Sequence, residues 1–212
     1  MAAERKRQAG GIAPDKSAVA LLVIDMISDY RFEEAPQMLP RLGPVVRRIA
    51  ALKGKARTDG IPAIYVNDNF GRWQSDFSGL VKYCTAADQP GADLVRQLAP
   101  EKDDYFILKP RHSGFYASSL ETLLEHMGAR RLILTGISSH QCVLFTANDA
   151  YVREYELKIP RDCIAAPSPP QKRLALQYFG TVLGADIRPS ARFRQWASPR
   201  GKRKKAPRHG RD

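Results

Sequence analysis

The feature that most constrains the fold is a series of short, almost wholly apolar segments that alternate with helical patterns. A strand that is apolar throughout is covered on both faces, and strands that alternate with helices predict a parallel α/β sheet. Two weaker segments suit the edges of that sheet. The expected fold is therefore a single-domain, doubly wound, mainly parallel six-stranded sheet with helices on both faces, of the Rossmann-like kind. The six predicted strands are 18–24, 62–66, 105–108, 131–135, 156–159 and 185–187.

Four helices are predicted from apolar residues that recur at helical spacing. Glycines that can adopt a left-handed conformation, Gly60 and Gly128, end the first two of them. The last is entered through Pro169 and Pro170. The residues that form the four apolar faces are Val45, Val46, Ile49 and Leu52; Leu120, Leu123, Leu124 and Met127; Val143, Leu144, Ala147, Ala150 and Tyr151; and Leu174, Ala175, Tyr178, Phe179 and Val182.

One connection, residues 67–90, is longer than the short loops that link the other elements. It has little helical periodicity apart from a possible turn near Leu80. A connection of this length in a compact domain is usually functional or mobile. Its aromatic residues, among them Phe70 and Trp73, could form the wall of a substrate pocket or pack onto the body of the domain.

Composition restricts the class of protein. Of the 212 residues, 43% are hydrophobic and 26% are charged, which is typical of a soluble globular domain. No apolar run approaches the roughly 20 residues that span a bilayer, and the first residues lack the apolar segment of a signal peptide. Three cysteines without a Cys-x-x-Cys pair argue against a disulfide framework or a structural zinc site. We therefore expect a protein of the reducing cytoplasm.

The net charge of +12 is concentrated at the ends of the chain. Residues 200–212 carry +6 and residues 1–8 carry +2, which leaves +4 for the rest. We predict a basic extension at 1–16, one domain at 17–192 and a basic, disordered tail at 193–212. The tail could bind polyanions weakly, but the distribution of charge does not predict a specific nucleic-acid partner.

Three chemically distinct side chains follow predicted strands. Asp25 comes directly after the first strand, Lys109 after the third, and Cys142 shortly after the fourth, through Gly136. Because functional groups of a doubly wound sheet gather at the carboxyl ends of its strands, we expect these three at one edge. A helix start at Cys142, with Ser138 and Gln141 as a capping box, would favour the thiolate.

This combination suits a cysteine nucleophile. A carboxylate near a thiol can take its proton and later return it to a leaving group, and an ammonium nearby favours both anions. Each residue also has an ordinary interpretation, as a helix cap, a solvated lysine or a buried thiol. A Cys–His pair is the rival mechanism. His140 is badly spaced for it, whereas His112 remains open. No set of His, Asp and Glu has the spacing of a metal site.

The stretches 22–26, 109–116 and 135–150 resemble the isochorismatase-like cysteine hydrolases, the superfamily that includes nicotinamidases and N-carbamoylsarcosine amidase. The likeness covers roughly residues 17–190. It implies that Asp25, Lys109 and Cys142 form a catalytic triad. It also implies a cis peptide bond between Ile137 and Ser138, with the backbone N–H groups of Ser138 and Cys142 as an oxyanion hole.

The resemblance further implies a small-molecule substrate, a homo-oligomer and no membrane partner. The metal ligands of nicotinamidases have no counterpart beyond Asp68, so we expect a metal-independent amidase-type hydrolase that needs no cofactor. Pocket residues are predicted at Asn69, Phe70, Trp73 and Phe115. Two alternatives stay open. One is a vinyl ether hydrolase of the isochorismatase type, and the other is a non-catalytic binding or assembly protein that has kept the fold.

Overall fold

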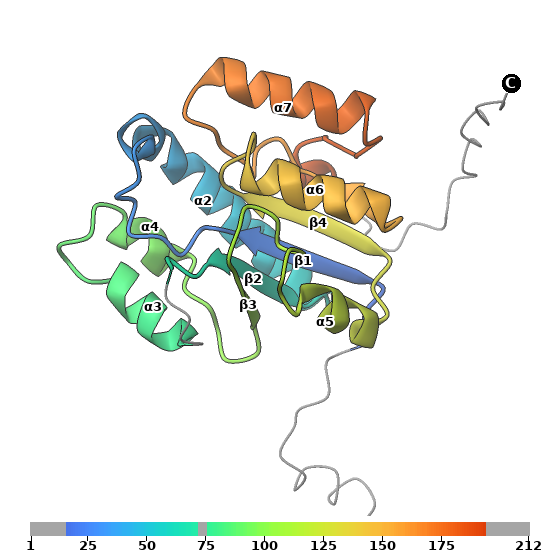
Figure 1. Cartoon of the computed structure of the whole chain (residues 1–212), viewed down its shortest axis with the longest axis horizontal. Coiled ribbons are helices and arrows are strands. Elements are labelled where there is room, and N and C mark those ends of the chain that lie inside the picture. The colour runs from blue at the N-terminus through green and yellow to red at the C-terminus, as the bar shows by residue number, and fades with distance from the viewer. Residues whose placement is uncertain (1–15, 72–75, 194–212) are drawn as a thin grey trace, which may run out of the picture.

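The computed structural model describes residues 16–71 and 76–193, and in them a parallel sheet is flanked by helices on both faces (Figure 1). The strand order is β3-β2-β1-β4-β5, and all pairs of neighbours are parallel. The predicted α/β fold is therefore confirmed. The strands are β1 (Val19–Ile24), β2 (Ala63–Asp68), β3 (Tyr105–Lys109), β4 (Arg131–Gly136) and β5 (Glu156–Lys158).

The sheet has five strands in the described residues, so the prediction of six is wrong. The expected sixth segment, 185–187, contributes only an isolated parallel bridge between Lys158 and Asp186. Its central residue carries a carboxylate that is hydrogen-bonded to Arg188 in the turn that follows. A segment this short that turns at once cannot build a ladder against a three-residue neighbour such as β5.

Each face of the sheet carries its own hydrophobic core, because side chains alternate between the two faces of a strand. On one face, Leu21 and Val23 of β1 pack with the long helix α2 (Ala35–Thr58) and with the two short helices α3 (Phe77–Cys84) and α4 (Ala92–Gln97). On the other, Leu22 and Ile24 pack with α5 (Leu120–Met127), α6 (Cys142–Val152) and α7 (Pro169–Thr181). This arrangement buries all six residues of β1.

Helix α2 starts at Ala35, ten residues before the first residue of its predicted apolar face. Pro40 and Pro44 lie within it, and proline ordinarily interrupts a helix. The apolar face nevertheless continues through Met38 and Leu42, both buried against the sheet. Tertiary burial therefore outweighs the local cost of the prolines. The predicted end is correct, since Gly60 follows the helix with a φ of +69°.

The apolar face predicted for α7 is only partly buried. Ala175 and Phe179 belong to the core, whereas Leu174 is 69% exposed and Val182 is 52% exposed. α7 lies as an outer helix beyond α6 in the fold (Figure 1). Part of its apolar surface therefore stays outside the core.

The long connection 67–90 contains α3, which includes the turn expected near Leu80. Asp76 caps this helix by accepting a hydrogen bond from the Gly79 N–H. Residues 72–75, which include Trp73, lie outside the described residues.

The predicted terminal extensions lie outside the described residues, apart from Lys16 and Phe193. Phe193 is 2% exposed and follows a short 3-10 turn, η1 (Ser190–Arg192). The packed domain therefore reaches one residue further than the predicted boundary at 192. In the described residues, no helix is both long and apolar enough to cross a membrane.

Candidate active site

The strand order places a topological switch point between β1 and β4. The chain builds β2 and β3 on one side of β1 and then crosses to form β4 on the other. Helices and loops diverge at such a point and leave a crevice at the carboxyl ends of the strands. Asp25 directly follows β1, and Cys142 begins α6 after β4, so both residues border this crevice.

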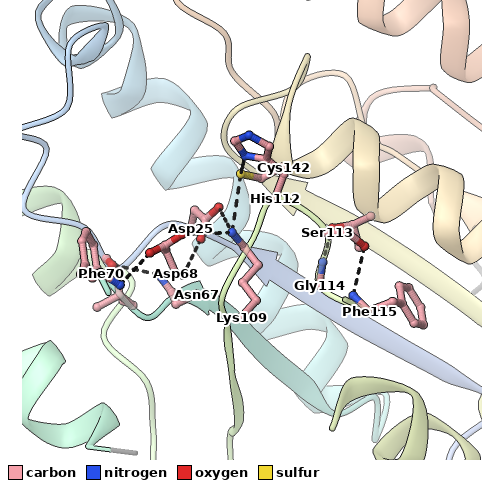
Figure 2. Close-up of polar contacts among 12 residues, drawn as sticks. Asp25, Asn67, Asp68, Phe70, Lys109, His112, Ser113, Gly114, Phe115 and Cys142 are labelled. Carbon is pink, nitrogen blue, oxygen red and sulfur yellow. Dashed lines mark hydrogen bonds and ion pairs between the residues drawn. The ribbon is translucent and has the colours of Figure 1, made fainter. Parts of the chain in front are cut away.

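Lys109 ends β3, which is separated from β1 by β2. Lys109 therefore does not lie on a strand that neighbours the strand of Asp25. The long side chain of Lys109 spans the width of β2 and reaches Asp25. The Nζ atom lies 2.9 Å from Oδ2 of Asp25 and 3.6 Å from Sγ of Cys142 (Figure 2). The structure thus brings the carboxylate, the ammonium and the thiol together around a single nitrogen.

Asp25 is held in place by its backbone and by its side chain. Its φ of +51° is unusual for a residue with a side chain, although aspartate tolerates it better than most. Its N–H donates to the Val66 carbonyl at 2.9 Å. Its Oδ1 atom accepts a hydrogen bond of 2.8 Å from the N–H of Asp68, the last residue of β2. The carboxylate therefore has a fixed position with Lys109 on its other oxygen.

Lys109 is fully buried, yet it remains the cation of the site. Burial alone lowers the pKa of an amine, because it removes water from the charged form. Here the interactions with Asp25, with Cys142 and with Asp68 together outweigh burial, and the pKa of Lys109 is raised. The Asp68 carboxylate contributes from a greater distance, 3.9 Å.

The pKa of the Cys142 thiol results from a different balance of burial and charge. Burial raises the pKa of its thiol to about 12, and the charge of Asp25 acts in the same direction, while Lys109 acts against them. The expectation that the helix start favours the thiolate is therefore not met in the resting protein. A neutral thiol at this position needs a proton acceptor before it can attack, and the Asp25 carboxylate, whose charge already acts on the thiol, is a candidate acceptor.

The turn between β4 and α6 carries the two backbone donors that the resemblance implies for an oxyanion hole. Gly136 has a φ of +111°, and a Cβ atom on it would lie 2.0 Å from the Ile24 carbonyl oxygen, so only glycine fits. The next peptide bond, Ile137–Ser138, is cis, as the resemblance implies. In the described residues, the N–H groups of Ser138 and Cys142 donate to no other protein atom. They are thus free to hold an oxyanion.

The predicted capping box is absent. The Gln141 side chain forms no cap at the start of α6, and the Ser138 hydroxyl contacts Nδ1 of His140 at 2.8 Å instead. The start of α6 is held by backbone bonds, in which the N–H groups of Gln141 and Val143 donate to the Ser138 carbonyl. Cys142 nevertheless occupies the first helical position, as the sequence predicts.

The predicted pocket residues have different positions. Asn69 and Phe70 line a cavity of about 230 Å³ together with Leu108, the neighbour of Lys109. Phe115 does not line it, because its ring is buried in the core against Tyr155. Trp73 lies outside the described residues.

Asp68 is better described as a support for the site than as the start of a metal centre. Its Oδ1 atom accepts a hydrogen bond of 2.6 Å from the Phe70 N–H, and its own N–H holds Asp25. Across residues 16–71 and 76–193, no group of three or more His, Cys, Asp and Glu side chains could hold a metal ion.

Two further residues lie near Lys109 and Cys142, one of which sequence reasoning missed. Nδ1 of His112 lies 3.6 Å from Sγ of Cys142, and the sequence left that residue open. Phe145, which the sequence did not single out, stacks on the His112 ring. Its spacing from Cys142, three residues along a helix, is the signal that could have placed it beside the thiol.

A parallel α/β fold with an acid, a lysine and a cysteine at its switch point defines a site of the cysteine hydrolase type. Comparison with known proteins agrees, because the model of the isochorismatase domain matches residues 19–187. The chain therefore belongs to the isochorismatase family of hydrolases.

Two curated relatives illustrate the range of that family. The chain is 42% identical over 172 residues to the uncharacterized isochorismatase family protein YaaI of Bacillus subtilis, covering 81% of this chain and 94% of that protein. It is 31% identical over 204 residues to the ureidoacrylate amidohydrolase RutB of Methylorubrum extorquens, covering 82% and 80%. Among solved structures, it is similar to N-carbamoylsarcosine amidase from Thermoplasma acidophilum, with 26% identity, a TM-score of 0.64 and coverage of 84% and 100%.

Proposed function

We propose that the protein is a cysteine-dependent, metal-independent hydrolase that cleaves an amide C–N bond of a small molecule through a thioester. The observation that carries this proposal is the placement of Lys109 Nζ within 2.9 Å of the Asp25 carboxylate and 3.6 Å of the Cys142 sulfur. A buried cation that touches both an acid and a thiol has no evident purpose in a binding protein. It does serve a reaction in which the proton and the negative charge move between those two groups.

In the first half of the reaction, the Asp25 carboxylate takes the thiol proton as Sγ of Cys142 attacks the amide carbonyl carbon. An S–C bond forms, and the carbonyl π electrons move to the oxygen. The N–H groups of Ser138 and Cys142 hold that oxyanion, and each such donor contributes about 3 kcal/mol in other hydrolases. The C–N bond then breaks, and protonated Asp25 gives its proton to the departing nitrogen.

In the second half, water cleaves the thioester, and the acid product leaves as the Cys142 thiol is restored. Lys109 stays charged throughout, because its pKa is raised by the anions that surround it. The amide class is supported by the activities of two similar proteins, a ureidoacrylate amidohydrolase and an N-carbamoylsarcosine amidase. One of these proteins acts on a ureido compound and the other on a carbamoyl compound, which favours a ureido or carbamoyl group on the substrate.

A vinyl ether hydrolase of the isochorismatase type is the alternative, and the family name makes it a natural comparison. That chemistry can proceed without a covalent bond to cysteine. Amide hydrolysis and vinyl ether hydrolysis therefore differ in whether Cys142 becomes acylated.

The test is a screen of small amides, carbamoyl compounds and ureides that detects released ammonia or amine. We expect turnover of at least one compound by the native protein and its loss in Cys142→Ala. Since Cys142 is only half-buried at the start of α6, the variant should fold normally, which circular dichroism would establish. Undiminished turnover by the alanine variant would exclude the mechanism.

A further inference from the structure

His140 lies in the turn between β4 and α6, shortly before the Cys142 nucleophile, and both of its ring nitrogens have a polar neighbour. Nδ1 lies 2.8 Å from the hydroxyl oxygen of Ser138. Nε2 lies 3.4 Å from the side-chain amide nitrogen of Gln171, which belongs to the first turn of α7. The half-buried ring therefore links a residue of the oxyanion hole to α7, and the steps proposed above give it no role.

The orientation of the Gln171 amide follows from its other partner. Ser168, which precedes α7, donates its hydroxyl hydrogen to Oε1 of Gln171 at 2.6 Å. This distance is normal for a hydrogen bond between two oxygens and short for one from an amide nitrogen. Oε1 is therefore the atom beside Ser168, and the amide nitrogen is the atom that faces His140. An amide nitrogen donates hydrogen bonds and does not accept them.

The contact with Gln171 decides the tautomer of His140. Burial lowers the pKa of the ring below its ordinary value of 6.5, and the nearby carboxylate of Glu34 opposes this only in part. The ring is therefore neutral at neutral pH, with one nitrogen that donates and one that accepts. Because Gln171 donates, Nε2 is the acceptor and Nδ1 carries the hydrogen. The hydroxyl oxygen of Ser138 thus accepts a hydrogen bond from Nδ1–H of His140.

Ser138 is in this way held through two of its groups. Its carbonyl oxygen accepts from the N–H groups of Gln141 and Val143, and its hydroxyl oxygen accepts from His140. Its own N–H is one of the two proposed oxyanion donors and has no other protein acceptor in residues 16–71 and 76–193. Such a donor is most effective when its direction is fixed before the reaction begins. The contact with His140 contributes to that fixed direction.

We propose that His140 is a positioning residue for the oxyanion hole, an assignment that rests on the proposed function. Gln171 anchors the ring at Nε2, and Nδ1–H anchors the side chain of Ser138. The turn that carries the oxyanion donors is thereby tied to the first turn of α7. This role involves no proton transfer, because the ring keeps one tautomer throughout the reaction.

Two substitutions separate the functions of the two ring nitrogens. The amide group of asparagine reaches the position of Nδ1, so His140→Asn keeps a polar group beside Ser138 and loses the contact with Gln171. The amide group of glutamine reaches the position of Nε2, so His140→Gln keeps the contact with Gln171 and loses the one with Ser138. These variants form a matched pair, and circular dichroism should show the native fold in both.

The reaction is followed with p-nitrophenyl acetate, whose attack by Cys142 forms an oxyanion, and with an amide from the screen. We expect kcat of His140→Asn to stay within about 2-fold of the native value and kcat of His140→Gln to fall about 10-fold, with KM nearly unchanged. A ring that merely holds α7 in place would give the opposite order. The rate at which iodoacetamide alkylates Cys142 should not change, because that displacement forms no oxyanion.

A double-mutant cycle tests whether His140 acts through Ser138. Ser138→Ala removes the acceptor oxygen and should lower kcat by about the same factor as His140→Gln. The double variant should be no slower than either single variant, because both substitutions remove one and the same contact. Losses of kcat that multiply in the double variant would contradict the proposal.

The tautomer is measured without any substrate, by nitrogen-15 NMR of labelled histidine at neutral pH. We expect one ring with a protonated Nδ1 and an unprotonated Nε2, and its signals should be absent from His140→Asn. In Gln171→Met, which lacks the donor, this tautomer should lose its dominance. Gln177→Met, a change at an exposed position of the same helix, should leave the signals as they are.

The inference is overturned if His140→Gln keeps the native kcat, if His140→Asn is as slow as His140→Gln, or if the proton of His140 resides on Nε2. These outcomes leave the proposed function intact, since Cys142 would still be acylated. A native protein that releases no p-nitrophenolate and hydrolyses no amide in the screen would refute the proposed function, and the positioning role with it.

Discussion

Replacing Lys109 by methionine tests whether the buried cation holds the site together. Methionine has a similar length and fills the same space, but it cannot pair with the Asp25 carboxylate. The side chain of that carboxylate is only 15% exposed, so the variant leaves a largely buried charge without its cation. Removing one partner of a buried ion pair costs about 3–5 kcal/mol. Asp25 retains its hydrogen bond from the Asp68 N–H, which favours the lower end of that range.

The assay is urea unfolding at pH 7, followed by circular dichroism. A loss of about 3 kcal/mol lowers the unfolding midpoint by about 1–2 M, given the usual dependence of stability on urea. The matched control is the double variant Asp25→Asn/Lys109→Met, in which no buried charge is left unpaired. We expect it to recover most of the lost stability, because replacing both partners is often nearly neutral.

The pKa of Lys109 also predicts how the stability difference between the native protein and Lys109→Met changes with pH. Lys109 has a pKa above its ordinary value of 10.5 in the folded protein. A group whose pKa is raised by folding contributes its full stabilisation below the unfolded pKa and loses it as pH rises through the folded pKa. The stability difference between the native protein and Lys109→Met should therefore be constant at neutral pH and shrink above about pH 10.5. A Lys109→Met variant as stable as the native protein, or a double variant no more stable than the single one, would refute the reasoning.

Two further predictions concern the turn and the thiol. Gly136→Ala places a Cβ 2.0 Å from the Ile24 carbonyl oxygen, so its unfolding midpoint should correspond to a loss of about 3 kcal/mol or more, whereas Gly60→Ala, with open space around it, should cost only about 1 kcal/mol; equal costs would contradict the packing argument. The Cys142 pKa of about 12 predicts that iodoacetamide labels Cys142 faster with rising pH beyond pH 9. A labelling rate that is already at its plateau at pH 7 would show that the resting group is a thiolate.

The main features of the fold could be predicted from the sequence because the buried strands are almost wholly apolar and alternate with helices. Prediction failed where tertiary contacts override local preference. Helix α2 runs through two prolines because Met38 and Leu42 still reach the core, and α4 is too short to show a period. The prediction of a sixth strand failed for the opposite reason. Its three residues suit a strand by local preference, but the segment is too short to form a ladder of hydrogen bonds with β5.

At the site, the position of a residue relative to a strand could be predicted from the sequence. The direction in which its side chain points could not. Asp25, Lys109 and Cys142 could be assigned to one edge because each follows a strand. The sequence could not show that Lys109 reaches across β2, or that the Asp68 backbone holds Asp25. Phe115 illustrates the limit, because a residue close to the site along the chain turned out to face the core. The thiol pKa depends on burial and on Asp25, which sequence spacing does not reveal.

The central claim is that the Asp25 carboxylate activates the Cys142 thiol for covalent attack. The most direct measurement is rapid quenching of the protein with an amide substrate from the screen, followed by intact mass spectrometry and peptide mapping. We predict an acyl group on Cys142 in the native protein and none, on the same timescale, in Asp25→Asn. Substrate turnover without any adduct on Cys142, or acylation of Asp25→Asn at the native rate, would contradict it.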